Sequence, residues 1–416
     1  TFLCWTLYTA TSLQMVGVRD RPLAAAAAAV AAGAGALLLI YRSRRRRPSA
    51  FCLERVLRPN VLRVKSYAFP PRYDYTDPVL LDGNENPHGP PIDDPALLGL
   101  GLERYPDPRQ EALKAALAQL RGVRPGEIFL GVGSDEVIDM IIRVFCTPGT
   151  DSIVVCPPTY AMYSVFAAIN DVGVVAVPLT PAPDFRLRPA AIASSLTKRT
   201  KVVFLCSPGN PTGRILAWED VKAVLEAATN AVVVVDEAYI DFAPGGALGS
   251  QASAVSHFRS GEYPNLIVMQ TLSKAWGLAG ARLGLAFVSE PLAKVFAKVK
   301  APFNISILTE SVALQALARP ELVEERVSTI LAERERVAAA LEALHPKIAA
   351  VYPSEANFLL FRAPGAKALC DTLARESGIV IRYRGSMLHC QDCVRLTIGT
   401  EAENDRLLEA LGKALG

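Results

Sequence analysis

The sequence predicts an α/β protein with a mainly parallel β-sheet covered by helices on both faces, followed by a smaller α+β domain. Two observations predict this architecture. Short runs of β-branched residues alternate with helical patterns from about residue 80 to residue 300, which is typical of a parallel sheet. After Pro302 this alternation ends, and long helical periods are followed by short strands. A chain of 416 residues is long enough for two such lobes.

The segment at 1–58 is a different kind of sequence. Residues 1–50 contain one acidic residue, Asp20, and a run of arginines at 42–47 that follows an Ala-rich apolar stretch at 23–40. An arginine-rich, acid-poor leader is typical of an organelle transit peptide. The apolar stretch just reaches the length that crosses a bilayer, so a hydrophobic anchor is the alternative. A misassigned start is a third, because the chain opens on Thr1.

We expect the remaining chain to divide into three parts. Residues 59–100 form a Pro-rich N-terminal arm that joins the small domain, residues 101–300 form the large domain, and residues 301–416 form the small α+β domain. In the large domain the apolar runs predict buried strands at 152–156, 173–177, 201–206, 231–236, 266–271 and 283–288. A helix is expected to begin at residues 134–136, because Ile138, Ile141, Ile142 and Phe145 share one face.

In the small domain, helical periods predict helices at 305–317, at 321–344 and from Glu401 onward. Short strands are expected at 357–361, 380–383 and 394–398.

Neither the net charge nor the cysteine spacing indicates binding of nucleic acid or of a metal ion. The net charge is only +3, and one arginine cluster accounts for it. Cys390 and Cys393 form a C-x-x-C with His389 beside them, whereas a zinc site normally needs two more ligands at comparable spacing. We therefore expect buried, reduced thiols and no metal.

Polar clusters follow the predicted strands. They are SPGNPTG at 207–213, DEAY at 236–239 and TLSK at 271–274, while GVGSDE at 131–136 opens a helix. In open α/β sheets ligands bind outside the carboxyl ends of the strands. The four clusters together therefore predict one ligand site.

Lys274 and Asp236 are the two residues that suggest the chemistry. Lys274 follows a buried strand and precedes an apolar, Gly-rich loop; a desolvated lysine has a lowered pKa and attacks carbonyl groups. Asp236 ends a run of four valines, and a carboxylate buried there needs a cation, such as a protonated pyridine nitrogen. The alternatives are a solvated surface lysine and an aspartate that caps the next turn.

Other residues suit the remainder of a phosphorylated pyridine aldehyde, that is, pyridoxal phosphate. A phosphate is favoured by the helix start at Ser134 and Asp135, where backbone N–H groups are exposed. It is also favoured by the hydroxyls of Thr271 and Ser273 and by the guanidinium of Arg282. Asn210 and Tyr239 can donate to the phenolic oxygen, and Tyr160 can lie under the ring. Turn chemistry alone also explains Asn210, and Tyr160 can be a core residue.

These motifs resemble those of fold-type I pyridoxal-phosphate-dependent aminotransferases. Closer similarity is to histidinol-phosphate aminotransferases, over about residues 60–415 in order, in the motifs at 83–87, 104–106, 133–136, 158–163, 236–240, 271–275 and 394–400. The resemblance implies a seven-stranded sheet, a homodimer and a role in histidine biosynthesis. The implied reaction is transamination of L-histidinol phosphate with 2-oxoglutarate, giving 3-(imidazol-4-yl)-2-oxopropyl phosphate and glutamate.

The resemblance also implies roles for individual residues. Lys274 and Asp236 match the catalytic pair. The implied cofactor contacts are Ser134, Asp135, Glu136, Tyr160, Asn210, Asp236, Tyr239, Thr271, Ser273, Lys274 and Arg282, with Tyr105 lent across the dimer interface to the neighbour's cofactor phosphate. The substrate-side positions are Tyr67, Asn357, Arg382 and Arg395. Two guanidinium groups suit a phosphate dianion, although both arginines can also be exposed strand-end residues.

The sequence departs from the family in three places. Gly209 precedes Asn210 where the family often has asparagine, residues 69–75 beside Tyr67 are divergent, and bacterial members lack the N-terminal extension. Plant and algal members are plastid proteins with such an extension, which favours a cleaved plastid transit peptide. Alternative functions are an aromatic amino-acid aminotransferase, a decarboxylase of a phosphorylated amino acid and a non-catalytic regulator; no helix-turn-helix pattern supports the last.

Overall fold

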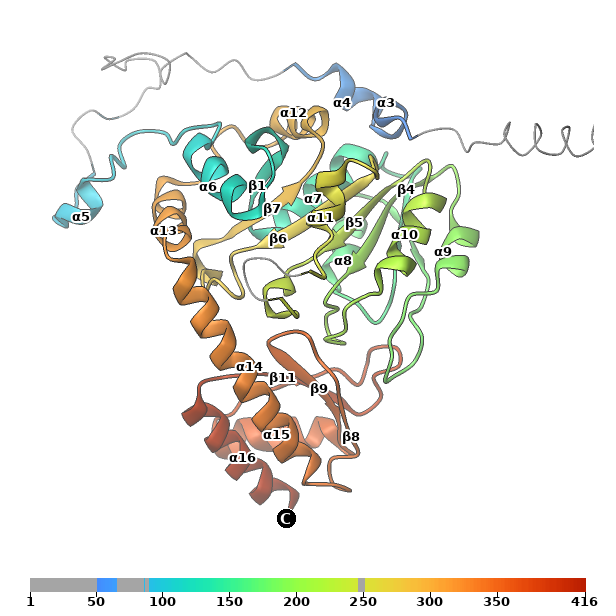
Figure 1. Ribbon diagram of the computed structural model, residues 1–416, viewed down its shortest axis with the longest axis vertical. Coiled ribbons are helices and arrows are strands. Elements are labelled where there is room, and N and C mark those ends of the chain that lie inside the picture. The colour runs from blue at the N-terminus through green and yellow to red at the C-terminus, as the bar shows by residue number, and fades with distance from the viewer. Residues whose placement is uncertain (1–50, 66–85, 87–89, 246–250) are drawn as a thin grey trace, which may run out of the picture. The chain divides into compact units, whose positions relative to one another are not determined.

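The computed structural model describes residues 51–65, 86, 90–245 and 251–416 (Figure 1). Of the predicted transit peptide or anchor at 1–58, residues 1–50 lie outside the described residues, as does the substrate-side Tyr67. Within the described part, no helix is both long and apolar enough to cross a membrane.

The large lobe is built on a seven-stranded sheet with the order β1-β7-β6-β5-β4-β2-β3, as expected. The neighbours from β6 through β3 pair in parallel, whereas β7 runs antiparallel to both β6 and β1. The strands are β1 (Ile128–Val132), β2 (Ser152–Val155), β3 (Gly173–Ala176), β4 (Thr200–Cys206), β5 (Val232–Asp236), β6 (Leu266–Thr271) and β7 (Leu283–Phe287).

Two strand predictions need correction. The strand β1, which completes the edge of the sheet beyond β7, was not predicted. The run at 173–177 was expected to be buried, but β3 is the opposite edge strand and most of its residues are exposed. Its Gly-Val-Val-Ala composition equals that of a buried strand, and only its place at the edge exposes it.

Helices cover both faces of this sheet. One face packs against α7 (Gly133–Phe145), α8 (Met162–Ile169) and α12 (Glu290–Val299). The other face packs against α6 (Glu111–Arg121), α9 (Pro189–Ser195), α10 (Trp218–Ala227) and α11 (Val255–Ser260). Alternate strand residues supply the two cores, as in Val203 and Val233 on one face and Val202 and Val232 on the other. The apolar residues of α7 recur at helical spacing because one side of it lies flat on the sheet.

The small lobe has a four-stranded antiparallel sheet with the order β10-β11-β9-β8, and helices pack on one of its faces. Its strands are β8 (Ala350–Tyr352), β9 (Phe358–Arg362), β10 (Arg382–Tyr383) and β11 (Cys393–Thr397), and its helices are α14 (Pro320–Glu342), α15 (Ala366–Ser377) and α16 (Glu401–Leu415). Figure 1 shows α14 running from α13 (Ile307–Leu317) down into this lobe. The short β8 was not predicted.

One apolar core joins the two lobes. In β9, Leu359 and Phe361 face the helices of the small lobe, whereas Phe358 and Leu360 belong to the core of the large lobe. The Phe358 ring meets the Tyr239 ring edge-on, with centroids 5.1 Å apart. The small sheet is therefore fixed against the large lobe beside the polar cluster at 236–239.

Residues 51–65 contribute to the core of the large lobe, although 51–58 fall in the predicted leader segment 1–58 and 59–65 in the arm that was expected to join the small domain. The short helices α3 (Leu53–Val56) and α4 (Pro59–Arg63) lie in this segment. Val56, Leu57 and Val61 are buried in the core with residues of α7 and α12. The Arg58 N–H donates to the Val144 carbonyl over 3.0 Å. These apolar side chains complete the core of the large lobe. Further along, α5 (Pro95–Leu98) has no buried residue.

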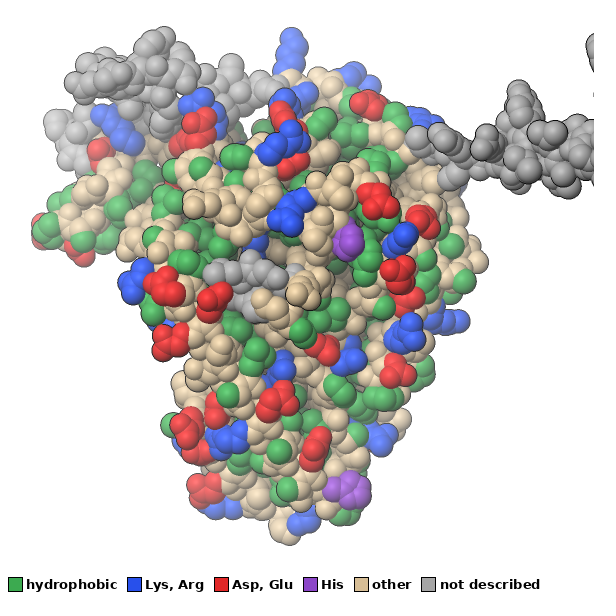
Figure 2. All heavy atoms as spheres, in the orientation of Figure 1, with side chains coloured by type: hydrophobic (Ala, Val, Ile, Leu, Met, Phe, Trp, Pro, Cys, Tyr) green, Lys and Arg blue, Asp and Glu red, His purple; other side chains and the backbone are tan. Residues whose placement is uncertain are grey.

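The charges of the visible face are mixed, and the cysteines of the C-x-x-C motif lie in the interior. Figure 2 shows acidic and basic side chains interspersed over the visible face of both lobes. Cys390 and Cys393 are buried free thiols. No group of three or more His, Cys, Asp or Glu side chains among the described residues is placed to hold a metal ion.

Candidate active site

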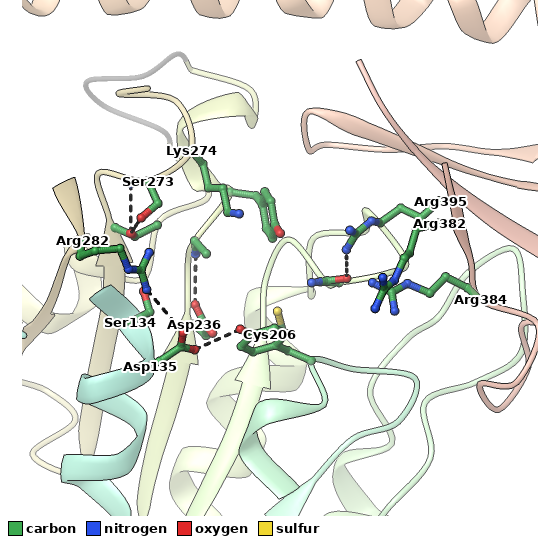
Figure 3. Close-up of a pocket in the computed structure, with 15 residues that line it drawn as sticks. Ser134, Asp135, Cys206, Asp236, Ser273, Lys274, Arg282, Arg382, Arg384 and Arg395 are labelled. Carbon is green, nitrogen blue, oxygen red and sulfur yellow. Dashed lines mark hydrogen bonds and ion pairs between the residues drawn. The ribbon is translucent and has the colours of Figure 1, made fainter. Parts of the chain in front are cut away.

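A cavity of about 320 Å³ lies at the carboxyl ends of the central strands of the large lobe and reaches the small sheet (Figure 3). The polar clusters that follow β4, β5 and β6 meet there, as parallel strands require. Its lining residues are Ser134, Asp135, Tyr160, Cys206, Asn210, Asp236, Ala238, Tyr239, Thr271, Ser273, Lys274, Arg282, Arg382, Arg384 and Arg395.

Lys274 enters the cavity just after β6. Its Nζ lies 5.5 Å from the centroid of the Tyr239 ring. Burial lowers the pKa of Lys274, and the positive charges of Arg395 and Arg282 lower it further. A lower pKa leaves more of the amine neutral near pH 7, which is the form that attacks a carbonyl carbon.

Asp236 lies across the cavity floor at the end of β5. The Tyr163 hydroxyl donates to one carboxylate oxygen over 2.6 Å, and the Ala238 N–H donates to the other over 3.2 Å. Burial raises the pKa of Asp236, while the Tyr163 hydrogen bond opposes that rise. Asp236 forms no ion pair with any described side chain. A cation in the cavity would therefore offset the cost of its burial.

A cup of donors forms one end of the cavity, at the N-terminus of α7. The Arg282 guanidinium lies 3.5 Å from the Asp135 carboxylate, and the Thr271 and Ser273 hydroxyls are 3.0 Å apart beside it. Gly133 has φ +72°, and a Cβ on it would overlap Arg282. A Cβ on Gly284 in β7 would overlap the backbone of Gly133 and Ser134. Glycine at both positions lets the helix start and the guanidinium approach one anion.

Tyr160, Asn210 and Tyr239 line the space between the cup and the small lobe. The Tyr160 hydroxyl donates to Asp135 over 3.0 Å, which holds its ring over the cavity. Asn210 Oδ1 accepts from Arg395 over 2.7 Å. Burial raises the pKa of Tyr239 to about 12, so its hydroxyl keeps its proton and acts as a donor.

The wall that faces Lys274 is formed by the small sheet. Arg382 and Arg395 are cross-strand partners in β10 and β11, and Arg384 lies two residues beyond Arg382. Figure 3 shows the three side chains pointing into the same space. Among the described residues, none of the three forms an ion pair.

Of the predicted site residues, three that the structure describes do not line this cavity, and a fourth falls outside the described part. The Glu136 carboxylate accepts from the Val132 N–H over 2.5 Å and from Asn304 over 3.1 Å, so it caps α7 and does not line the cavity. Asn357 is half-buried outside the lining and pairs its carbonyl with Ile398. Tyr105 is 48% exposed and stacks on Phe303. Tyr67, the fourth, is not described.

The sequence reasoning missed three residues of the site. Tyr163 is fully buried beneath Asp236, and Cys206 and Arg384 line the cavity. Alternation along an extended chain gave a usable signal for Arg384, because residues two apart face the same side. Nothing local marked Tyr163, whose partner is far away in the sequence.

Comparison with known proteins agrees with this geometry. The family model for aminotransferase class I and II matches residues 76–411. The chain belongs to this aminotransferase family. The histidinol-phosphate aminotransferase of Cytophaga hutchinsonii is 44% identical over 363 residues, covering 87% of this chain and 99% of that protein. The histidinol-phosphate aminotransferase of Saccharomyces cerevisiae is 41% identical over 390 residues, covering 88% of this chain and 98% of that protein.

Solved aminotransferase structures share the fold. The histidinol-phosphate aminotransferase of Sinorhizobium meliloti, in complex with pyridoxal-5'-phosphate, aligns with a TM-score of 0.66 and 28% identity over 80% of this chain and 89% of that one. The enzyme from Clostridium acetobutylicum aligns with a TM-score of 0.68 and 26% identity over 76% of this chain and 91% of that one.

The side chains of this aminotransferase fit pyridoxal phosphate. The donor cup at α7 suits its phosphate, and Lys274 suits its aldehyde carbon. The buried Asp236, which forms no ion pair with a described side chain, suits its ring nitrogen in the protonated form.

Proposed function

We propose that this protein transfers the amino group of L-histidinol phosphate to 2-oxoglutarate, with pyridoxal phosphate as cofactor. The observation that carries the proposal is the wall of arginines opposite Lys274, which offers a phosphate site at the far end of a cavity that already fits the cofactor. Histidinol phosphate carries a phosphate and no α-carboxylate, so the positive charges of this wall match the charge of the substrate. The similarity to named histidinol-phosphate aminotransferases supports the same substrate.

Lys274 and Asp236 have separate tasks in this reaction. Pyridoxal phosphate supplies an electron sink joined to the amine-bearing carbon of the substrate. Lys274 Nζ, whose lowered pKa leaves more of the amine neutral, would act as the base that accepts the proton from that carbon. Asp236 holds a proton at the ring nitrogen, and Tyr163 keeps its carboxylate in place. Asn210 and Tyr239 orient the ring through its phenolic oxygen.

The substrate specificity can be tested with purified enzyme. We expect kcat/KM for histidinol phosphate to exceed that for phenylalanine or tyrosine by at least about 100-fold, because two charge-assisted contacts are lost without the phosphate. A higher kcat/KM for the aromatic amino acids would instead support the alternative, an aromatic amino-acid aminotransferase.

We also propose that two copies of the chain form a homodimer over the apolar groove beside the donor cup. Val132, Leu308 and Val312 line this groove and are 41%, 45% and 43% exposed, although all three are apolar. Arg282 lines both the groove and the cavity, so a partner seated there would lie next to the cofactor phosphate. A hydroxyl lent by the partner, from its Tyr105, would complete the cup.

For the cell, we propose a plastid location directed by the part of the predicted segment 1–58 that precedes Phe51, since Val56 and Leu57 belong to the core of the large lobe. The arginine-rich composition of this segment and its position ahead of the family match at residue 76 support the proposal. Fusion of residues 1–58 to a fluorescent protein is expected to give plastid fluorescence and a shortened product. Retention of the full-length fusion in a membrane fraction would favour an anchor instead.

A further inference from the structure

Arg384, which follows β10, is the member of the arginine wall that was not expected from the sequence and that belongs to neither the core nor the donor cup at α7. Arg382 and Arg395 face each other across β10 and β11, although like charges directly opposite in a sheet repel. Arg384 adds a third positive charge to the same face, two residues beyond Arg382. No described carboxylate pairs with these three positive side chains, and such a cluster is costly unless an anion joins it.

The contacts of Arg384 fix its backbone, whereas its guanidinium Nε lacks a hydrogen-bond acceptor among the described residues. Its backbone N–H donates to the Cys393 carbonyl over 2.8 Å, which continues the ladder between β10 and β11 and fixes the start of the side chain. Its Nε is buried and has no hydrogen-bond partner among the residues that the structure describes. Figure 3 shows the head of Arg384 beside that of Arg382, in the space that faces Lys274.

Arg395, the neighbour of Arg384 in the wall, has a similar environment. Arg395 gives one N–H to Asn210, yet its Nε is also buried without a partner. Burial lowers the pKa of Arg384, and the charges of Arg395 and Arg382 lower it further. Binding an anion would relieve this repulsion and supply the missing acceptors.

The geometry points to Arg384 as a specificity residue that, with Arg382, binds a phosphate dianion in preference to a carboxylate. A carboxylate has two oxygens and one charge, and a single guanidinium fork satisfies it. A phosphate monoester has three free oxygens and nearly two charges, and it can use two forks as well as Arg395. This inference rests on the proposed function and extends it to the choice among amine donors.

The test compares four holoenzymes: the wild type, Arg384→Gln, Arg384→Lys and the control Arg362→Gln. Arg362 is an exposed arginine at the end of β9 that does not line the cavity. The amine-donor half-reaction is followed with histidinol phosphate, with histidinol, which lacks the phosphate, and with phenylalanine. Binding of inorganic phosphate is measured by calorimetry on the same proteins.

We expect Arg384→Gln to raise the apparent KM for histidinol phosphate by about 10- to 100-fold, the size of one charge-assisted contact, with little change in kcat. Its effect on histidinol and phenylalanine should be smaller than about threefold, because those donors lack the dianion. Arg384→Lys should recover part of the loss, since it keeps the charge but not the fork. The Kd for inorganic phosphate should rise in parallel, and Arg362→Gln should behave as the wild type.

Two outcomes would overturn the inference. One is an equal loss with all three donors, which would mean that Arg384 only supports the fold; the other is an unchanged KM for histidinol phosphate. Failure of the proposed function would look different. The wild type would then not use histidinol phosphate, whereas weakened binding of inorganic phosphate in Arg384→Gln would still support the dianion site.

Discussion

At the residue scale, Lys274 is the group on which the chemistry depends. Its amine faces the cavity and its pKa is lowered by burial and neighbouring arginines. We predict that Lys274→Ala lowers the turnover of histidinol phosphate by at least about 10³-fold, because both a nucleophile and a proton carrier are lost. Steady-state assays check this, and Lys294→Ala, an exposed lysine on α12, is the control. Undiminished turnover would contradict the assignment.

Tyr163 gives a second prediction at this scale. Tyr163→Phe removes the donor to Asp236 but keeps the ring that stacks on Phe204, 4.6 Å away. The pKa of Asp236 should rise, so the proton on the cofactor ring nitrogen is held less firmly. We expect kcat to fall by about 10- to 100-fold. The absorption of the bound cofactor should titrate at a different pH, and an unchanged titration would argue against a role of Tyr163.

The sequence was sufficient for most of the site residues but not for those whose contacts are distant. Lys274 comes shortly after β6, Asp236 ends β5 and Arg282 precedes β7, and the cavity brings the three together. Tyr163 bonds to a residue 73 positions away, and no local pattern contains that information. Glu136 carries a family motif, yet its carboxylate is taken up by the helix start, which only the backbone geometry reveals.

At the element scale, a buried carboxylate next to β5 couples stability to pH. Glu237 accepts hydrogen bonds from Gln270, Ser253 and Ala254, yet burial raises its pKa to about 7. The folded protein therefore holds this proton more tightly than the unfolded chain does. The contribution of Glu237 to stability should be greatest below pH 4.5 and should be lost as the pH rises to about 7.

We predict that Glu237→Gln flattens this dependence. The free energy of unfolding of the wild type should fall, relative to the variant, by at most about 3 kcal/mol over this interval. Urea unfolding at several pH values measures the difference, and Glu290→Gln, an exposed carboxylate on α12, is the control. Parallel curves for the wild type and Glu237→Gln would show that Glu237 does not titrate in this interval.

Elements were predictable where burial is complete on both faces. The strands β2 and β4 to β7 appear in the sequence as continuous apolar runs, because helices cover both sides of the sheet. The strand β1 escaped prediction because it leads directly into α7 through two glycines, and β8 because it has three residues. The exposure of β3 depends on its edge position, which its own residues do not encode.

At the scale of the whole molecule, the apolar groove predicts assembly. We expect the wild type to have twice the mass of one chain in solution, and Val312→Glu on α13 to shift it toward the monomer with weakened cofactor binding. Light scattering and cofactor dialysis measure both effects. Val380→Glu is the control, since Val380 is 85% exposed and outside the groove. A wild-type monomer that retains its cofactor would exclude the shared site.

The core that passes from the large lobe into β9 has a consequence for engineering. Phe358 and Leu360 reach the same cluster as Tyr239, so neither lobe has a complete interior without the other. Replacing the C-terminal part of this chain with that of a relative would therefore exchange only one side of the seam, that is, of the core that the two lobes share. Such a chimaera should fold only when the residues on both sides of that seam are exchanged as a set.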